Sequence, residues 1–212
     1  MADAPGFDPD CRRCPRLAAF LDEVRTEHPG YYCRPVPPFG DHQPGLLVVG
    51  LAPGRHGANA TGRPFTGDHA GILLYRTLHR FGFANRSAST AVDDGLVLTG
   101  CRITNAVKCL PPANKPVAAE VRNCNGYLAA EIGRLRDGAV VLALGSVAHD
   151  AVLRATGHRR ASFRFGHCAE HDLGRLRLLD SYHCSRYNTQ TGRLTEAMFE
   201  AVFVRAKRLL GA

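Results

Sequence analysis

Four short apolar runs, each followed by a polar or glycine-rich loop, constrain the fold of this chain more than any other feature. They occupy residues 46–50, 101–107, 139–144 and 176–181. Segments with helical spacing of apolar residues lie between and after them, at 70–81, 117–136, 146–155 and 194–209. Strands that alternate with helices predict an α/β fold with a mostly parallel sheet. Such sheets bind ligands at the carboxyl ends of their strands, so chemistry is expected in the loops that follow these runs.

The first 45 residues differ from the rest of the chain. A short helical stretch at 16–27 is surrounded by prolines and glycines, which predicts an arm laid on the main body. We therefore expect a single domain over residues 1–212, with 1–45 as its N-terminal arm. The sequence contains no run of about 18 apolar residues, so no membrane-spanning helix is expected. The N-terminus lacks the pattern of a signal peptide, so a cytoplasmic location is expected.

The net charge of +8 and the pI of about 9.3 indicate a polyanionic partner, nucleic acid above all. The alternative is a basic surface that binds nothing, because an arginine-rich composition can reflect genomic base composition. The chain shows no obvious dimerisation element, so a monomer is expected.

Eight cysteines suggest metal binding rather than disulfides, because the chain is not small and has no secretion signal. Cys11 and Cys14 form a C-x2-C pair, and Cys109 and Cys124 lie on either side of a proline-rich turn. Four thiolates at one site would suit zinc or an iron–sulfur cluster. Alternatively, Cys109 and Cys124 are ordinary half-buried thiols. Cys33 is the next candidate ligand, whereas Cys101, Cys168 and Cys184 lack paired spacing and Cys101 is expected in the core.

The loop that follows residue 50 contains an aromatic and an acid among many glycines. Phe65 is available to stack on a base. Asp68 stands at the expected start of a helix, where an N-cap role and a catalytic role are compatible. In the second loop, Asn105 ends a strand, and its amide could either read a base edge or satisfy the backbone.

The third loop, residues 181–195, combines His183 with two arginines, hydroxyls and amides. This mixture suits phosphate binding and a hydrogen-bonding imidazole. Lys108 and Lys115 flank the cysteine positions and are expected to contact phosphate. No lysine is placed for Schiff-base chemistry, so no lyase step is expected.

Together these segments resemble the uracil-DNA glycosylase superfamily and, within it, the fifth, type-b family of iron–sulfur enzymes. The resemblance rests on GLAPG…GRPFTGD (50–68), NAVKC (105–109), the four-cysteine pattern and HCSRYNTQTGRLT (183–195). It implies a three-layer α/β/α fold with a central, mostly parallel four-stranded sheet, and an arm bound to a 4Fe–4S cluster on Cys11, Cys14, Cys109 and Cys124. Two positions depart from the wider superfamily. Leu51 replaces a polar or acidic residue, and Cys184 replaces a frequent proline.

The resemblance also implies a monofunctional repair enzyme that flips a base out of DNA and leaves an abasic site. The partner would be DNA that contains uracil, hypoxanthine, xanthine or another deaminated base. Asp68, Asn105 and His183 are the expected catalytic residues. The expected base-binding residues are Gly50, Ala52, Phe65, Asn105 and His183, and the expected phosphate-binding residues are Ser185, Arg186, Asn188 and Arg193. The rival interpretations are a nucleic-acid-binding module without catalysis and an unrelated zinc protein.

Overall fold

The four apolar runs form the parallel centre of one sheet. The structure is a computed structural model and describes residues 6–211. The strands are β1 (Phe39–Gly40), β2 (Leu46–Gly50), β3 (Cys101–Asn105), β4 (Val140–Leu144), β5 (Glu170–Asp172) and β6 (Arg177–Ser181). Their order is β1-β3-β2-β4-β6-β5, with β3, β2, β4 and β6 parallel to one another.

The expectation of a four-stranded sheet was therefore incomplete. Two short strands, β1 and β5, pair antiparallel at the two edges, so the sheet is mixed and has six strands. Edge strands of two or three residues bury little side-chain surface. Their sequences therefore lack the alternation of apolar and polar residues from which a strand is predicted.

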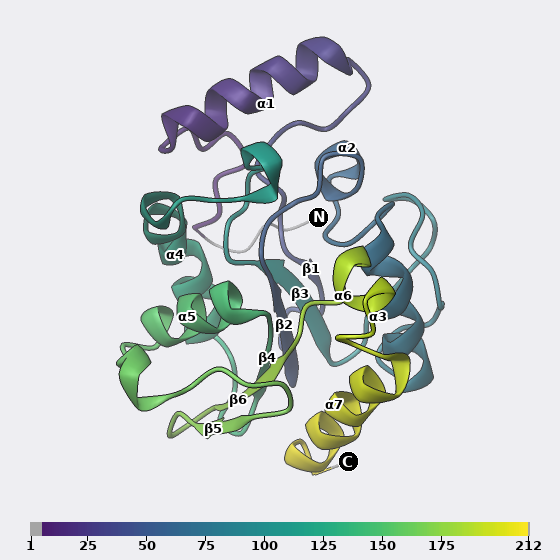
Figure 1. Ribbon diagram of the computed structural model, residues 1–212, viewed down its shortest axis with the longest axis vertical. Helices are drawn as coiled ribbons and strands as arrows, with labels where there is room; N and C mark the ends of the chain where they lie inside the picture. The colour runs from purple at the N-terminus through teal and green to yellow at the C-terminus, as the bar shows by residue number, and fades with distance from the viewer. Residues whose placement is uncertain (1–5, 212) are drawn as a thin grey trace.

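Helices cover both faces of the sheet, as Figure 1 shows. The helices are α1 (Pro15–Glu27), α2 (Ala58–Thr61), α3 (His69–Arg80), α4 (Ala118–Gly133), α5 (Ser146–Ala155), α6 (Arg186–Gln190) and α7 (Glu196–Leu209). Short 3-10 turns lie at Pro112–Asn114 and Arg160–Ser162. The long helices begin and end within a few residues of the predicted bounds, whereas α6 was not predicted because it is only five residues long.

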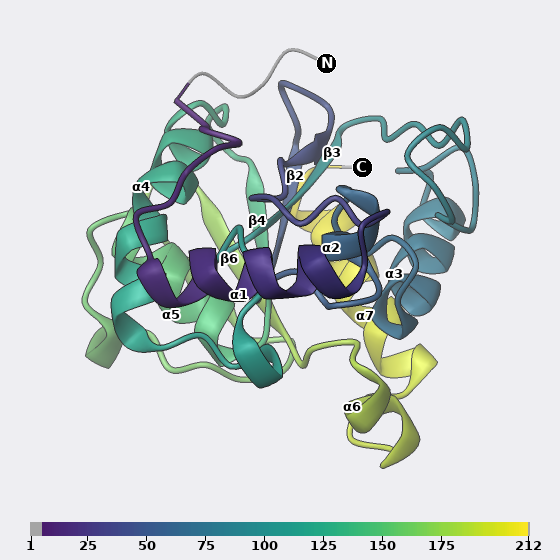
Figure 2. The same ribbon diagram turned by 90° about the horizontal axis from the view of Figure 1, so that it is seen from above.

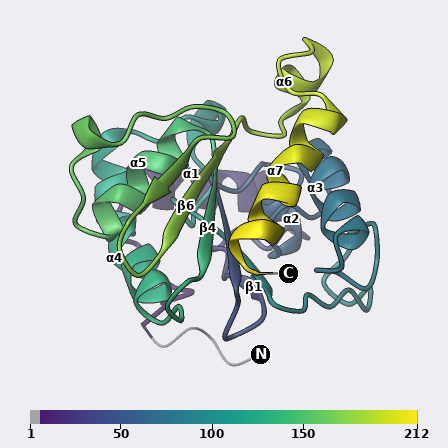
Figure 3. The same ribbon diagram turned by 90° about the horizontal axis from the view of Figure 1, so that it is seen from below.

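Alternate residues of each central strand point to opposite cores, which makes the three layers. Val48 and Leu142 pack in the core that includes α3 and α7. Val49 and Val141 pack in the core that includes α4 and α5. Figure 3 shows α7 and α3 on one side of the sheet and α4 and α5 on the other.

The N-terminal arm lies across the end of the sheet where the parallel strands finish, as seen from above in Figure 2. Leu21 and Val24 of α1 form a small core with Cys33 of the arm and Leu110 of the main body. Arg16 adds a two-pronged ion pair to Glu120 of α4, with both N–O distances at 2.8 Å. No helix among residues 6–211 combines the length and the apolar character needed to cross a bilayer.

Candidate active site

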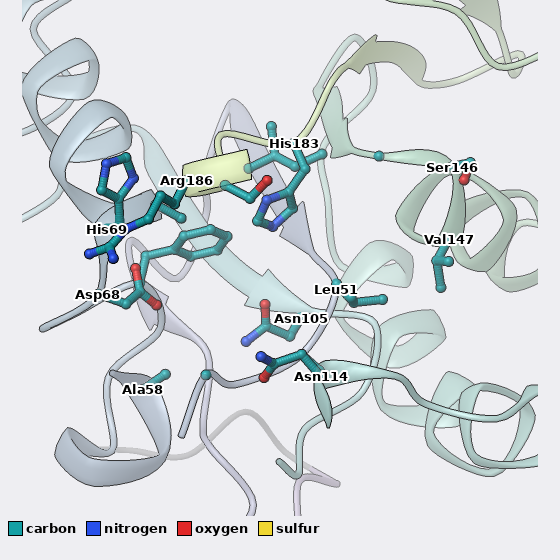
Figure 4. Close-up of a pocket in the computed structure, with 17 residues that line it drawn as sticks. Leu51, Ala58, Asp68, His69, Asn105, Asn114, Ser146, Val147, His183 and Arg186 are labelled. Atoms are coloured by element: carbon teal, nitrogen blue, oxygen red, sulfur yellow. The ribbon is translucent and has the colours of Figure 1, made fainter. Parts of the chain in front are cut away.

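The three predicted loops meet at one cavity of about 470 Å³ at the carboxyl ends of the parallel strands (Figure 4). The predicted site residues that line it are Ala52, Phe65, Asp68, Asn105, His183, Ser185 and Arg186. This size is typical of small-ligand pockets. The order of the strands places the cavity where the chain passes from one neighbour of β2 to the other, which is the usual ligand position in such sheets.

Phe65 forms a wall of the cavity. Its ring lies nearly parallel to the imidazole of His183, with the ring centroids 5.9 Å apart and an interplanar angle of 27°. The backbone of Phe65 has a φ of 56°, in the left-handed region that a bulky residue adopts only when its surroundings enforce it. The loop therefore holds this aromatic face in a defined place.

Gly50 lies behind this wall and does not line the cavity. A Cβ atom at Gly50 would come within 2.4 Å of the Asn105 amide oxygen and 2.6 Å of the Phe65 ring. Only glycine lets these two side chains approach the end of β2. In the structure it makes room for the site residues, while the direct base contact expected of Gly50 stays a prediction.

Asn105 is buried at the end of β3, and its amide oxygen has no hydrogen-bond partner within the described chain. A buried acceptor without a partner costs free energy, and natural proteins usually satisfy such a group. Because this side chain lines the cavity, a ligand that offers an N–H group there would satisfy it.

Asp68 is the N-cap of α3, as the sequence predicted. Its Oδ1 accepts a hydrogen bond from the backbone N–H of Gly71 at 2.8 Å. Burial raises the pKa of this carboxyl group above its usual value, although hydrogen bonds from Gly71 and Ala70 oppose the shift. The other oxygen, Oδ2, lies near Gly54 and Gly57, where a Cβ would stand 3.6 Å and 2.7 Å from it.

His183 presents a neutral imidazole to the cavity, because burial lowers its pKa to about 4. A neutral ring has one N–H donor and one acceptor. The loop that carries His183 is tied down by Asn188, whose side-chain amide donates to the His183 carbonyl at 2.8 Å. Asn188 therefore positions the histidine and does not line the cavity.

The other phosphate-binding candidates are divided between the rim and the outer surface. Ser185 caps α6, and the exposed Arg186 lines the cavity. Arg193 is also exposed but lies outside the cavity, with its guanidinium 4.7 Å from the centroid of the Tyr182 ring.

Several residues that line the cavity were not among the predicted site residues, and Asn114, Ser146 and Val147 are three of them. Asn114 lines it from the 3-10 turn, and its amide lies beside that of Asn105 in Figure 4. Ala113 and Asn114 both have positive φ values, 53° and 55°. An asparagine after two prolines and an alanine is the only signal of this turn, since asparagine tolerates the left-handed region. Ser146 and Val147 line the opposite side from the start of α5.

The four predicted metal ligands line a second, smaller cavity between the arm and the main body. Cys11 and Cys14 come from the arm, Cys109 from the loop after β3 and Cys124 from α4. All eight cysteines are free thiols. Cys33 packs in the apolar cluster under α1 and does not line this cavity, and Cys101 is buried in the main core, as expected.

The expectation that Lys108 contacts phosphate was wrong. Lys108 is 1% exposed, and its ammonium group contacts the Glu131 carboxylate at 2.6 Å and the hydroxyl of Thr104. A buried ion pair of this kind serves as internal structure, because neither partner can reach a ligand. Lys115 remains on the surface.

Comparison with known proteins establishes the family. A family model described as the uracil DNA glycosylase superfamily matches residues 37–207. The chain belongs to this superfamily. Within the uracil DNA glycosylases, it is 48% identical over 209 residues to the type-5 uracil-DNA glycosylase of Thermus thermophilus, covering 95% of this chain and 94% of that protein. It is 43% identical to the type-5 uracil-DNA glycosylase of Pyrobaculum aerophilum, covering 93% and 88% of the two chains.

These matches assign the chain to the type-5 uracil-DNA glycosylases, in agreement with the family resemblance of its loops. The similarity to a type-4 uracil-DNA glycosylase of Pyrobaculum aerophilum is 39% identity over 58% of this chain and 56% of that protein. The crystal structure of Pedobacter heparinus SMUG2 superposes with a TM-score of 0.52 at 13% identity, over 80% of this chain and 76% of that chain. At that identity the likeness concerns the fold alone.

Proposed function

We propose that the protein is a base-excision-repair enzyme that hydrolyses the N-glycosidic bond between uracil and deoxyribose in DNA. The observation that carries the proposal is the unpartnered, buried Asn105 amide oxygen in a cavity that it shares with an aromatic wall and a neutral histidine. Membership of the type-5 family supports the same conclusion, because the relatives carry that activity in their names.

The substrate base has to leave the helical stack to enter such a cavity, at a cost of a few kcal/mol that is smallest for mispaired bases. Phe65 offers the apolar face on which the extruded base stacks. The Asn105 amide oxygen accepts a hydrogen bond from the base edge, and its NH2 group donates to a neighbouring carbonyl. Asn114 stands beside it and can add a second amide contact.

Bond cleavage moves electrons from the C1′–N bond onto the departing base. His183, neutral near pH 7, donates a hydrogen bond to the pyrimidine O2, where negative charge develops. The sugar gains oxocarbenium character, which the Asp68 carboxylate stabilises. Water then bonds to C1′ through its oxygen, and the proton it loses ends on the free base. Asp68 can also orient that water, since only one of its oxygens caps α3.

We extend the proposal to hypoxanthine, xanthine and other deaminated bases. Leu51 and Ala52, which line the cavity, present only apolar side chains and no polar group that would select a pyrimidine. An asparagine amide can meet either a donor or an acceptor on a base edge. Incubation with a panel of single-lesion duplexes measures this breadth, and excision of uracil alone would contradict it.

The proposed reaction ends at the abasic site. Among the described residues that line the cavity there is no lysine to form a Schiff base, and the buried Lys108 is held by Glu131. Ser185 and Arg186 at the rim are proposed to hold the phosphates next to the extruded nucleotide, with Arg193 further out. All these residues come from one chain, so we propose that a monomer acts.

We further propose that Cys11, Cys14, Cys109 and Cys124 hold a 4Fe–4S cluster. Hydrogen-bond donors already surround the sulfurs: the Lys108 N–H lies 3.2 Å from Cys124 Sγ, and the Asn123 amide 3.7 Å from Cys14 Sγ. Such contacts are typical of cluster thiolates. The role we propose for the cluster is to tie the arm to the main body.

The first test is Asn105→Ala, assayed on a duplex with one uracil followed by alkaline cleavage of abasic sites. We expect excision to fall at least a hundredfold, because the loss removes a contact to the base that strengthens as charge moves onto it. The exposed Asn85→Ala serves as the control, at a side chain that bonds only to loop backbone near Gly95 and Val97. Duplex binding without any abasic product from the unmodified protein would contradict the proposed function.

A further inference from the structure

A groove between α4 and α5 lies next to the active-site cavity. Val147, near the start of α5, lines both the cavity and the groove, so the two are neighbours on the surface. In Figures 1 and 2, α4 and α5 lie side by side on the same face of the sheet. The groove has a volume of about 600 Å³ and leads away from the cavity toward the carboxyl end of α5.

The charge of this groove is strongly positive. Its walls carry Arg122 of α4, Arg154 of α5, and His158 and Arg160 of the segment after α5. Asp150 is the only acid that lines it, and Asp150 is already paired with Arg160 at 2.9 Å. Arg122 and Arg154 are exposed, and no ion pair joins either of them to another residue in the described part of the chain.

We propose that this groove binds the phosphate backbone of the DNA strand on one side of the extruded nucleotide. The proposal rests on the function proposed above, and it adds a phosphate-binding surface on the opposite side of the cavity from Ser185 and Arg186. An extruded nucleotide remains bonded to its strand in both directions, so the strand has to leave the cavity along two paths. Arg186 and α6 stand on one side, and Val147 marks the other.

The length of the groove matches a short run of phosphates. Arg154 follows Val147 by seven positions, which is about 10 Å along a helix. One strand of B-DNA has a phosphate about every 3.4 Å along the duplex axis, so a groove of this length that runs parallel to that axis faces about three phosphates. Two unpaired guanidiniums over that distance can neutralise two of them. An acidic protein partner would offer charge as well, but it would not also enter the cavity.

The test compares Arg122→Ala/Arg154→Ala with a matched control, Arg86→Ala/Arg208→Ala, which removes the same charge from exposed residues that line neither the cavity nor the groove. Binding to an undamaged duplex is measured by fluorescence anisotropy at several salt concentrations. We expect the groove variant to bind about tenfold more weakly at low salt and to lower the slope of log K against log salt by about 2. Arg122→Lys/Arg154→Lys should retain most of the affinity, because a point charge still meets a phosphate.

A second measurement locates the contact. Uracil duplexes are shortened to two nucleotides beyond the lesion, in one series on the 5′ side and in another on the 3′ side. In one of the two series the shortened strand no longer reaches the groove. We expect the groove variant to bind as well as the unmodified protein in that series and more weakly in the other. Equal losses in the groove and control variants, or a deficit that persists in both series, would overturn the proposal. The binding measurement uses undamaged DNA, so its result does not depend on whether the protein excises uracil.

Discussion

The two carboxylate oxygens of Asp68 have different surroundings. Oδ1 accepts the Gly71 N–H and begins α3, while Oδ2 is turned toward the glycines of the loop after β2. A single residue can therefore serve the fold and the proposed chemistry at the same time. The two contributions can be separated because asparagine caps a helix as well as aspartate does, but carries no charge.

Asp68→Asn is predicted to lower excision at least a hundredfold with little change in stability. Asp68→Ala should lose the same activity and also about 1 kcal/mol of unfolding free energy, since the cap disappears. Single-turnover assays and urea unfolding measure the two effects. Equal stability of the two variants would contradict the capping role.

Protonation of Asp68 is expected to lower the excision rate at acidic pH. Burial raises the pKa of Asp68, so its carboxyl group gains a proton at a higher pH than an exposed aspartate does. The excision rate should fall as pH drops through that raised pKa, and Asp68→Asn should remove the dependence. His183 stays neutral above its own pKa of about 4. A wild-type profile that matches that of Asp68→Asn would exclude Asp68 as the titrating group.

Gly57 is predicted to be intolerant of a side chain because it lies against Asp68. A Cβ there would meet Asp68 Cβ at 2.6 Å, so Gly57→Ala should displace the carboxylate and lower excision at least tenfold. Gly126→Ala is the matched control. It lies in the interior of α4 with no atom within 4 Å of its added Cβ, and it should raise stability by about 1 kcal/mol. Unchanged excision in Gly57→Ala would contradict this account of the Asp68 position.

At the scale of elements, a buried polar cluster joins α5 to the edge of the sheet. His149 Nδ1 lies 2.8 Å from Asp180 Oδ1 of β6, and His149 Nε2 lies 3.0 Å from the Phe163 carbonyl. Both neighbours accept hydrogen bonds, so the imidazole donates from both nitrogens and is positively charged. His171 of β5 contacts the second oxygen of Asp180 at 3.0 Å. The cluster thereby fixes the segment 157–169 that precedes β5.

His149→Ala is predicted to destabilise the protein by about 3–5 kcal/mol, because it removes one of the two imidazoles that contact the fully buried Asp180. The exposed His79→Ala is the control and should change stability by less than about 0.5 kcal/mol. Thermal and urea unfolding give the comparison. A loss in His149→Ala no larger than that of the control would show that the pair is not charged.

The pH dependence of this cluster has a definite sign. Contacts with Asp180, the Phe163 carbonyl and Asp150 outweigh burial and raise the pKa of His149. The stabilisation is fully present below the unfolded-state pKa of about 6.5 and is lost as pH rises through the folded-state pKa.

At the scale of the whole molecule, the N-terminal arm contacts the main body through a small apolar cluster, the ion pairs Arg16–Glu120 and Glu27–Arg55, and the pairing of β1 with β3. Cysteines of the arm and of the main body line the second cavity. We expect the proposed cluster to add to the docking of the arm at this point.

From the proposed cluster we expect the anaerobically purified protein to be brown. Cys14→Ala is then predicted to abolish this absorbance and to expose the arm to proteolysis near α1, because it removes one of the four proposed ligands. Cys168→Ala, at an exposed cysteine away from the second cavity, is the control and should leave the spectrum unchanged. A brown Cys14→Ala protein would exclude this residue as a ligand.

Much of the fold was predictable because its signals are local. The central strands are continuous apolar runs, and α5 begins and ends where its pattern and the preceding Gly145 indicate. Gly145, with a φ of 96°, turns the chain from β4 into α5 as only glycine does readily. The edge strands and α6 were missed because they are too short to carry a period.

The sequence by itself determined the α/β class, the end of the sheet at which the site lies, and the side chains of three loops, since apolar periodicity and strand-end position are properties of neighbouring residues. The tertiary structure alone decided that Lys108 is an internal partner of Glu131, that Asn114 faces Asn105, and that Val147 opens onto a basic groove. These relations depend on which distant segments meet, and burial decides whether a charged side chain pairs inside the protein or remains available to a ligand.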